Sequence, residues 1–123
     1  MRLVLRSKIH RVWVTDANPG NVGSILIDQD LMDKTDLRDS EKVLVCDVTN
    51  GNRFETHVIA GERGSGVCSV QGAAARLSSK GNCLIIMSFE ATEKPVGPKM
   101  ILVDEENRFV EYLEGTKNVQ QVH

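Results

Sequence analysis

The stretch VLVCDVTNGNRFETHVIA, residues 43–60, decides the fold class of this chain. It holds two runs rich in β-branched residues, Val43–Val48 and Arg53–Ala60, on either side of the dipeptide Asn50-Gly51. Asn-Gly is the strongest short-range signal for a β-hairpin, because both residues tolerate the positive φ angles of a tight turn. The apolar first run predicts a strand that is buried on both faces. We therefore expect two antiparallel strands in the core of a mainly β domain.

The second strand of this hairpin carries polar residues that could form a site. Alternation places Arg53 and His57 on one face, where they could act together. Thr56 belongs to the opposite face and would need a bulge or a twist to join them. The hairpin thus offers a guanidinium and an imidazole at one surface.

Outside the hairpin, short β-branched segments separated by turn residues recur about every ten positions, which favours a barrel or a sandwich. The predicted strands cover residues 8–15, 25–27, 67–70, 83–89, 100–103 and 109–113. A brief helix capped by Asp28 or Asp30 runs through Lys34, and a second short helix covers residues 72–77. We expect a single domain over residues 1–114 and a flexible C-terminal tail over residues 115–123.

Composition and charge exclude several classes of protein. The chain has 123 residues, 41% of them apolar, which suffices for one packed core without metals or disulfides. Its net charge is −2, with 15 basic and 17 acidic residues intermixed, so no basic surface for nucleic acid is expected. The cysteines and histidines are widely spaced and match neither a metal-ligand pattern nor a disulfide framework. No apolar run is long enough to cross a membrane, and we expect a cytoplasmic protein.

Near the N-terminus, Gly23-Ser24 is a dipeptide from which a chain can make its own cofactor. The serine hydroxyl can attack the glycine carbonyl to form an ester, and elimination then leaves a pyruvoyl group, an electrophilic ketone that no encoded side chain supplies. A second copy, Gly64-Ser65, shows that the dipeptide alone does not define a site. The surrounding sequence must distinguish the two.

Short blocks of sequence around this dipeptide match a known pattern in order and spacing: Lys8–Val12, Gly23-Ser24, Ile27–Asp30, Val48–Gly51, Arg53-Phe54, Ala60–Ser65 and Gly72–Ala75. With these blocks the chain resembles the aspartate 1-decarboxylase family over residues 2–113. The resemblance implies a double-psi β-barrel with short helices, a homotetramer with active sites between neighbouring subunits, and cleavage between Gly23 and Ser24. It also implies a pyruvoyl group derived from Ser24 and a small amino-acid substrate. Some relatives require a separate maturation factor, and the sequence leaves open whether this chain needs one.

The resemblance assigns roles to residues of the matching blocks. Ser24, once converted, would be the reactive centre, whose ketone condenses with the substrate amine and draws electrons from the α-carbon as carbon dioxide leaves. Arg53 corresponds to the residue that binds a substrate carboxylate, which suits the planar fork of a guanidinium, and Lys8 to a substrate-binding lysine. The alternative is that both are solvated side chains at strand ends or edges.

Two further segments match parts of the family's processing and binding machinery. Thr56 corresponds to the threonine whose hydroxyl assists self-cleavage by stabilising the oxyanion that develops at the Gly23 carbonyl. Gly72, Ala73 and Ala74 correspond to a segment whose small side chains and backbone groups approach the reactive centre and the substrate. An ordinary strand-forming threonine and an ordinary helical turn are the alternatives.

Three positions depart from the family pattern, all at or beside the expected site: Asn21, His57 and Gln71. His57 stands where the family usually has a tyrosine that protonates the carbanion left by decarboxylation, and an imidazole with a pKa near about 6.5 can donate this proton too. Gln71 replaces an asparagine with a longer amide side chain, which could slow maturation or reshape the pocket. Asn21 replaces another usual tyrosine, and Val22 a residue that is often acidic, so the loop before the scissile bond changes shape.

Three functions stay open on the sequence. The first is a pyruvoyl-dependent decarboxylase, self-processed at Ser24, that removes the α-carboxylate of L-aspartate to give β-alanine or acts on a close analogue. The second keeps self-processing but acts on another small amino acid, as the departures at His57 and Gln71 would allow. The third is an unprocessed, non-catalytic barrel that assembles as a structural or binding subunit.

Overall fold

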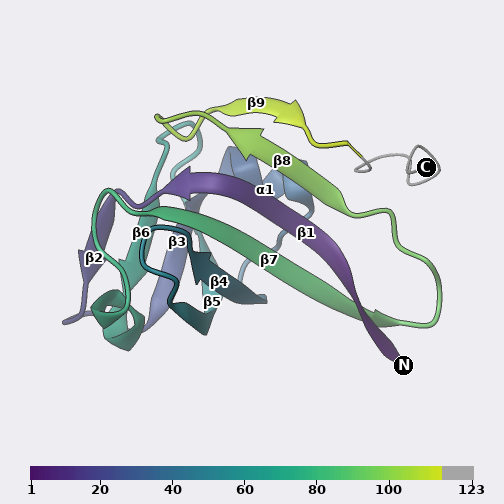
Figure 1. The fold of residues 1–123 in the computed structure, drawn as a ribbon, viewed down its shortest axis with the longest axis horizontal. Coiled ribbons are helices and arrows are strands. Elements are labelled where there is room, and N and C mark those ends of the chain that lie inside the picture. Colours follow the sequence, from purple (N-terminus) through teal and green to yellow (C-terminus); the bar gives the residue numbers. More distant parts are fainter. Residues whose placement is uncertain (115–123) are drawn as a thin grey trace.

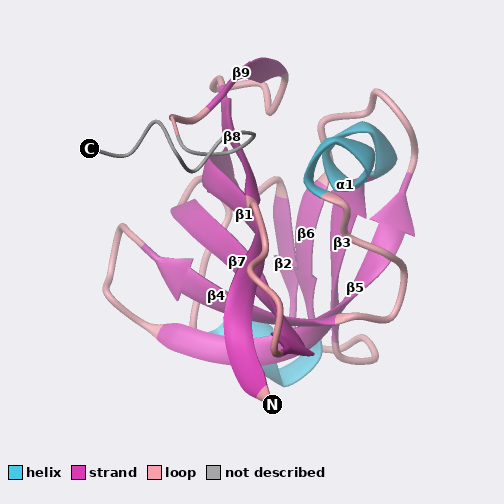
Figure 2. Ribbon diagram, turned by 90° about the vertical axis from the view of Figure 1, so that its right-hand side faces the viewer, coloured by secondary structure: helices cyan, strands magenta, loops and turns pink. Residues whose placement is uncertain are grey.

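The computed structural model describes residues 1–114, which fold into strands and two short helices. In chain order the elements are β1 (Arg2–Trp13), β2 (Asp16–Asn18), β3 (Ser24–Asp28), α1 (Gln29–Thr35), β4 (Lys42–Asp47), β5 (Arg53–Gly61), β6 (Cys68–Gln71), the 3-10 helix η1 (Gly72–Arg76), β7 (Cys83–Thr92), β8 (Lys99–Val103) and β9 (Phe109–Tyr112). The strands join in one mixed sheet in the order β2-β6-β3-β5-β4-β7-β1-β8-β9. Figures 1 and 2 show this sheet curling round on itself, and Figure 2 places α1 and η1 at opposite ends. The predicted mainly β barrel with short helices is confirmed.

The hairpin at Asn50-Gly51 forms as predicted. Strands β4 and β5 pair in antiparallel register with Val45 opposite Phe54, and Gly51 in the turn has a φ of 81°. The prediction that the first of these strands is buried on both faces is wrong, because Leu44 and Cys46 are only half-buried. Strand β4 lies in a sheet with one face on the core, so its side chains alternate between inside and outside.

The interior of the barrel is filled by aliphatic side chains from strands far apart in the sequence. Ile9 and Val12 of β1, Ile25 and Ile27 of β3, and Val58 of β5 are each fully buried. Burial of one such side chain contributes about 1.5–3 kcal/mol to folding. Because this interior is mainly apolar, chemistry must take place at the rims of the barrel or on its outer face.

The N-terminal strands differ from the prediction. Strand β1 begins at Arg2 rather than at Lys8, and it pairs with β7 along nearly its whole length. Strand β2 was not predicted; it pairs in parallel with β6. Its three residues are polar or small, so its existence depends on this distant partner rather than on local propensity.

The two helices form where the sequence predicted them. Helix α1 begins after Asp28, whose carboxylate accepts a hydrogen bond from the Asp30 N–H at 2.8 Å. The predicted helix over residues 72–77 is η1, a 3-10 helix. The domain boundary at residue 114 stays a prediction, and the predicted tail, residues 115–123, lies outside the described residues. No helix within residues 1–114 is long and apolar enough to span a membrane.

Candidate functional site

Gly23 and Ser24 lie at the boundary between an exposed loop and a buried strand. Gly23 is exposed, whereas Ser24, the first residue of β3, is only 3% exposed. The loop before them contains a turn in which the Asn18 side chain accepts the Gly20 N–H at 2.9 Å. The junction therefore combines an exposed glycine with a serine that the sheet holds in place.

Strand β6 and helix η1 form the wall behind this junction. Gln71 pairs with Ser24 in the antiparallel register of β3 and β6. Gly72, with a φ of 81°, lies so close to Gly23 that a Cβ added to Gly72 would stand 2.5 Å from the Gly23 Cα. Gly72 thus contacts the glycine at the expected cleavage point directly, and only a residue without a side chain fits there.

The small residues that follow Gly72 line the same end of the barrel. Ala73 is exposed and Ala74 is half-buried, both in η1. Neither carries a polar side chain, so only their backbone groups could donate or accept hydrogen bonds. The structure therefore brings Gly23 and Ser24 together with Gln71 and Gly72, and Ala73 and Ala74 follow directly in η1.

Two of the three departures from the family pattern contact each other. Nδ2 of Asn21 donates a hydrogen bond to Oε1 of Gln71, and Nε2 of Gln71 donates one to Oγ of Ser69. Ser69 was not identified from the sequence. The available signal was its position two residues before Gln71 on the same strand, which places both side chains on one face.

His57 lies on the strand beside Ser24, as strand register shows. Ile25 of β3 pairs in parallel with Val58 of β5, and Ser24 and His57 are the residues that directly precede this pair. His57 is exposed, and Thr56 before it is half-buried. The pairing of β5 with β4 runs from Arg53 to His57 without a register shift, so no bulge in that segment brings Thr56 to the face of His57.

Lys8 and Arg53 lie apart from Ser24 within one chain. Lys8 is on β1, and strands β7, β4 and β5 separate β1 from β3 in the sheet. Arg53 precedes His57 by four residues on β5, which corresponds to about 13 Å along a strand. The structure therefore does not assemble the full set of predicted site residues around one serine.

These two cations share the outer face of the sheet instead. Strand registers connect Arg53 through Cys46 and Ile85 to His10, two residues after Lys8 on β1. The side chains between the cations are half-buried and mostly apolar: Leu44, Cys46, Ile85 and Met87. This outer face, centred on these four residues, joins Lys8, His10 and Arg53 on one surface.

His10 is a further candidate that the sequence analysis did not single out. Its Nδ1 atom is buried and has no hydrogen-bond partner within the described structure. Burial lowers the pKa of His10, and the positive charges of Lys8 and Arg11 lower it further. His10 is therefore a neutral imidazole at pH 7 on the same face as Lys8.

The second Gly-Ser dipeptide is held in a different way. The N–H of Gly64 donates to the buried carboxylate of Asp28 at 3.0 Å, and Ser65 Oγ donates to the Glu62 carbonyl at 2.6 Å. The serine hydroxyl is thereby directed at a carbonyl other than that of the preceding glycine. The two dipeptides therefore differ in structural setting as well as in sequence context.

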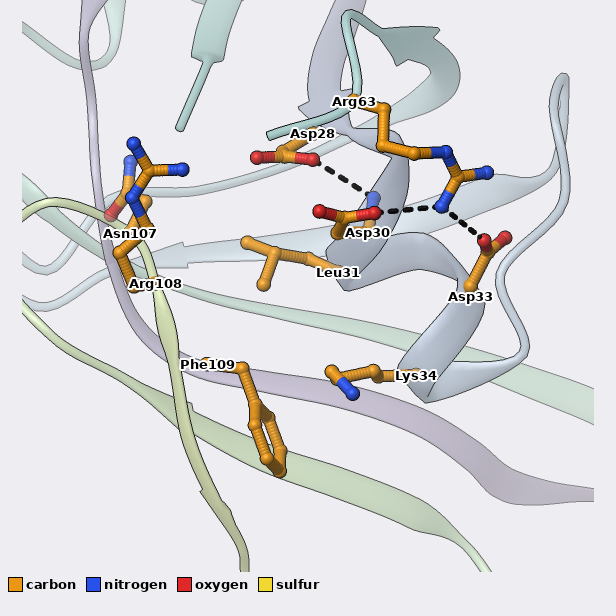
Figure 3. A pocket seen from close by; sticks show the side chains of 9 residues that line it. All are labelled: Asp28, Asp30, Leu31, Asp33, Lys34, Arg63, Asn107, Arg108 and Phe109. Carbon is orange, nitrogen blue, oxygen red and sulfur yellow. Dashed lines mark hydrogen bonds and ion pairs between the residues drawn. The ribbon is translucent and has the colours of Figure 1, made fainter. Parts of the chain in front are cut away.

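A pocket of about 390 Å³ lies beside α1, at the far end of β3 from Ser24 (Figure 3). Among its lining residues, Arg63 binds Asp30 and Asp33 at 2.7 Å each, and dashed lines mark these ion pairs in the figure. These ion pairs are exposed, and each contributes little. These pairs neutralise opposite charges and link α1 to the loop after β5. We therefore interpret the residues around this pocket as structural.

The cysteines are free thiols, with Cys68 and Cys83 buried and Cys46 half-buried. Burial raises the pKa of the Cys68 thiol to about 12, so it stays protonated and inert as a nucleophile. Among residues 1–114, no group of three or more histidine, cysteine and acidic side chains is arranged to hold a metal ion.

Comparison with known proteins identifies the family. The sequence model described as aspartate decarboxylase matches residues 1–110. A protein of Acetivibrio thermocellus named aspartate 1-decarboxylase is 52% identical over 111 residues, which cover 87% of this chain and 88% of that protein. Proteins of the same name from Clostridium botulinum (strain Loch Maree) and Pseudothermotoga lettingae are 46% and 47% identical, over 97% and 89% of this chain and 89% and 97% of theirs. The chain belongs to the aspartate decarboxylase family.

Proposed function

We propose that the chain is the precursor of a pyruvoyl-dependent decarboxylase that cleaves itself between Gly23 and Ser24 and removes the α-carboxylate of L-aspartate to give β-alanine. The observation that carries this proposal is the junction itself, where an exposed Gly23 precedes a buried Ser24 and the Gly72 backbone presses on Gly23. Membership of the family and the names of its relatives supply the reaction and the substrate.

Self-processing at this junction balances with one water molecule. Oγ of Ser24 adds to the Gly23 carbonyl carbon, the peptide C–N bond breaks, and the hydroxyl proton passes to the new amine. Elimination then removes the Cα proton of residue 24 and breaks its Cβ–Oγ bond, which leaves a carboxylate on Gly23 and a dehydroalanine at position 24. Its enamine takes up a proton at Cβ to become an imine, and water hydrolyses the imine to the ketone and ammonia.

The residues around Ser24 fit a pyruvoyl group. Ser24 is buried on β3, Gly72 beside the junction has no side chain, and Ala73 and Ala74, which follow it, have small ones. When present, the ketone binds the substrate amine and accepts the electron pair released with carbon dioxide. The chain's own residues must then orient the substrate and return a proton to its α-carbon.

His57 is the residue that we assign to proton return. It directly precedes the residue that pairs with Ile25, so its side chain belongs beside position 24. Its exposure in one chain leaves the imidazole free to turn toward a bound substrate. Thr56, on the opposite face of β5, is assigned to stabilising the oxyanion on Gly23 during self-cleavage, and Gln71 to the same step through its contact with the loop.

Lys8 and Arg53 are assigned to the substrate carboxylates, but they serve a serine of a neighbouring copy. Within one chain both cations lie on the outer face, away from Ser24. That face continues into a hollow of about 480 Å³ between β4 and β7, where Leu3 is 76% exposed and Phe89 is 40% exposed. Apolar surface of this kind is typical of an interface. A homotetramer with shared sites would cover it and complete each site.

The experiment that tests the proposal is intact mass spectrometry of the purified protein after prolonged incubation. We expect two chains, residues 1–23 and a second chain from position 24 that is lighter by one ammonia than a simple hydrolysis product. A hydrazine should trap its ketone, and the purified enzyme should release carbon dioxide and β-alanine from L-aspartate. Ser24→Ala is the control that stays intact. Only full-length chain without a trapped ketone would sink the proposal, unless a separate maturation factor restores cleavage.

A preference for another small amino acid is the second candidate, favoured by His57 and Gln71 at positions where the family usually has tyrosine and asparagine. Carbon dioxide release across a panel of amino acids separates the two, since the first candidate requires a clear preference for L-aspartate.

The three free cysteines are typical of a protein from a reducing compartment, and we propose the cytoplasm as its location.

A further inference from the structure

We propose that Asn21 and Gln71 act as one positioning unit, anchored on Ser69, that holds the loop before Ser24 in the conformation needed for self-cleavage. The inference rests on the proposed function, since it concerns the same bond. It assigns a role to Asn21 and Ser69, both of which bond the Gln71 amide. All three are positioning residues here, because their side-chain hydrogen bonds within residues 1–114 run to one another and not to Gly23 or Ser24.

The unit connects an exposed loop to a buried strand. Asn21 is exposed, whereas Gln71 is 9% and Ser69 5% exposed. The Gln71 amide uses both ends: Oε1 accepts from Asn21 and Nε2 donates to Ser69. A nearly buried amide with both groups bonded has few alternative partners, so the loop residue that completes the set is held firmly.

The unit adds a side-chain restraint to a residue whose backbone hydrogen bonding is weak. Strand pairing with Gln71 fixes Ser24, and the Gly72 backbone lies in close contact with Gly23. Upstream, the Asn21 N–H reaches the Asn18 carbonyl only at 3.5 Å, which is a weak bond. The Asn21 side chain therefore supplies an attachment to the buried strand at the start of the segment that carries the Gly23 carbonyl.

Placement of this carbonyl decides the rate of the first step. Oγ of Ser24 must approach the carbonyl carbon of its own preceding residue, and small errors of position in such reactions reduce rates by about a hundredfold. The segment Asn21–Gly23 has few other restraints, since Val22 is 88% exposed. Loss of the Asn21–Gln71 bond should therefore slow cleavage while leaving the barrel folded.

The unit permits a test in which either single change is mild and their combination is severe. With Asn21→Asp, the Gln71 amide can turn over, so that Nε2 donates to the new carboxylate and Ser69 donates to Oε1. With Gln71→Glu, Asn21 and Ser69 can both donate to the new carboxylate. With both substitutions, two acceptors face each other and the bond is lost.

The measurement is the rate at which full-length chain disappears, followed by intact mass for the unchanged protein, both single variants and the double variant. If the two substitutions acted independently, their fold-reductions in cleavage rate would multiply. We expect the double variant to cleave about tenfold or more slowly than that independent expectation. Lowering the pH toward about 5 should restore part of its rate, because one carboxyl then carries a proton and can donate. Two charged or titratable residues lie near the unit along the strand registers: Asp16 opposite Ser69, and His57 on β5. All four proteins contain both, so their titration does not distinguish the variants.

A control creates the same pair of facing carboxylates elsewhere. Gln29 Nε2 donates to Asp33 on the exposed side of α1 at 3.0 Å, so Gln29→Glu opposes two acids at the far end of β3 from Ser24. Its cleavage rate should not change. Ser69→Ala and Ser69→Thr provide a second pair, in which alanine should slow cleavage and threonine, which keeps the hydroxyl, should restore it.

Each outcome decides the proposal. A double variant whose rate equals the product of the single effects, or a Ser69→Ala variant as fast as the unchanged protein, overturns it. Should the double variant fail to fold by circular dichroism, the serine pair decides alone. If the unchanged protein cleaves while coupling is absent, only this inference fails; if the unchanged protein never cleaves, the proposed function fails and takes the inference with it.

Discussion

Gly72 and Gly23 touch backbone to backbone, since a Cβ on Gly72 would stand 2.5 Å from the Cα and 2.7 Å from the N of Gly23. The contact joins the start of η1 to the residue before the proposed cleavage point, across a gap of many residues in sequence. A real Cβ atom does not approach backbone this closely, so a side chain at Gly72 would push Gly23 away.

The first prediction concerns this contact. Gly72→Ala should slow self-cleavage by about tenfold or more, because Gly23 must shift from its place beside Ser24. Gly51→Ala is a matched control: Gly51 has the same φ of 81° but nothing within 4 Å of an added Cβ. Both should lose about 1–2 kcal/mol of stability from the left-handed backbone. Urea unfolding and intact mass measure the two effects, and equal cleavage rates in both variants would contradict the prediction.

The second prediction concerns the division of the site between copies. Ser24→Ala and Arg53→Ala should each lack activity, yet hybrid oligomers of the two, isolated through different tags, should decarboxylate L-aspartate. A hybrid interface would join an intact position 24 from one copy to an intact Arg53 from another. Hybrid oligomers of Ser24→Ala with His57→Ala are the control. They should stay inactive, since Ser24 and His57 lie on neighbouring strands of the same chain and no chain in the hybrid has both. Inactive hybrids of the first kind would place the whole site in one chain.

The third prediction concerns proton return. His57→Ala should leave self-cleavage intact but reduce turnover of L-aspartate by about a hundredfold or more, the usual effect of losing a general acid. His57→Tyr should retain much of the activity, because a phenol also donates a proton. Steady-state assays of fully cleaved enzyme provide the measurement. A His57→Ala enzyme with normal turnover would make the residue an ordinary exposed strand histidine.

The fourth prediction concerns pH. The pKa of His10 is lowered in the folded chain by burial and by Lys8 and Arg11, so the unfolded chain binds a proton more readily. Stability should therefore be complete above the unfolded pKa of about 6.5 and should fall as the pH drops from there toward the folded value. Urea unfolding of the unchanged protein and of His10→Gln at several pH values isolates this contribution. A difference between the two proteins that does not vary with pH would rule it out.

Features fixed by neighbouring residues were predictable from the sequence. The hairpin follows from Asn50-Gly51, whose turn chemistry needs no distant partner, and the start of α1 follows from the carboxylate of Asp28. The three-residue strand β2 was missed because it exists only through pairing with β6. The burial of β4 was overestimated because an apolar run does not reveal whether its second face meets the core or an outer surface.

The sequence supplied candidate site residues, which stay predictions, but not their arrangement in space. Alternation correctly put Arg53 and His57 on one face, yet only the strand order reveals that Lys8 lies three strands from β5 and that β3 is on the other side. The Asn21–Gln71 contact was also out of reach, although both residues were noticed as departures. Nothing in one sequence indicates that two unusual residues compensate each other across a turn.

Strand β1 gives the proposed cleavage a consequence for the life of the protein. It pairs with β7 and β8, buries Ile9 and Val12, and exchanges hydrogen bonds between Trp13 and the Asn107 side chain at 2.8 and 2.9 Å. Cleavage after Gly23 would cut this strand from the rest of the chain while leaving it inside the sheet. The mature molecule would then be two polypeptides that share one fold. Once unfolded, they could refold only by meeting again in solution, so refolding would depend on protein concentration. Maturation would thus create the reactive group at the cost of unimolecular refolding.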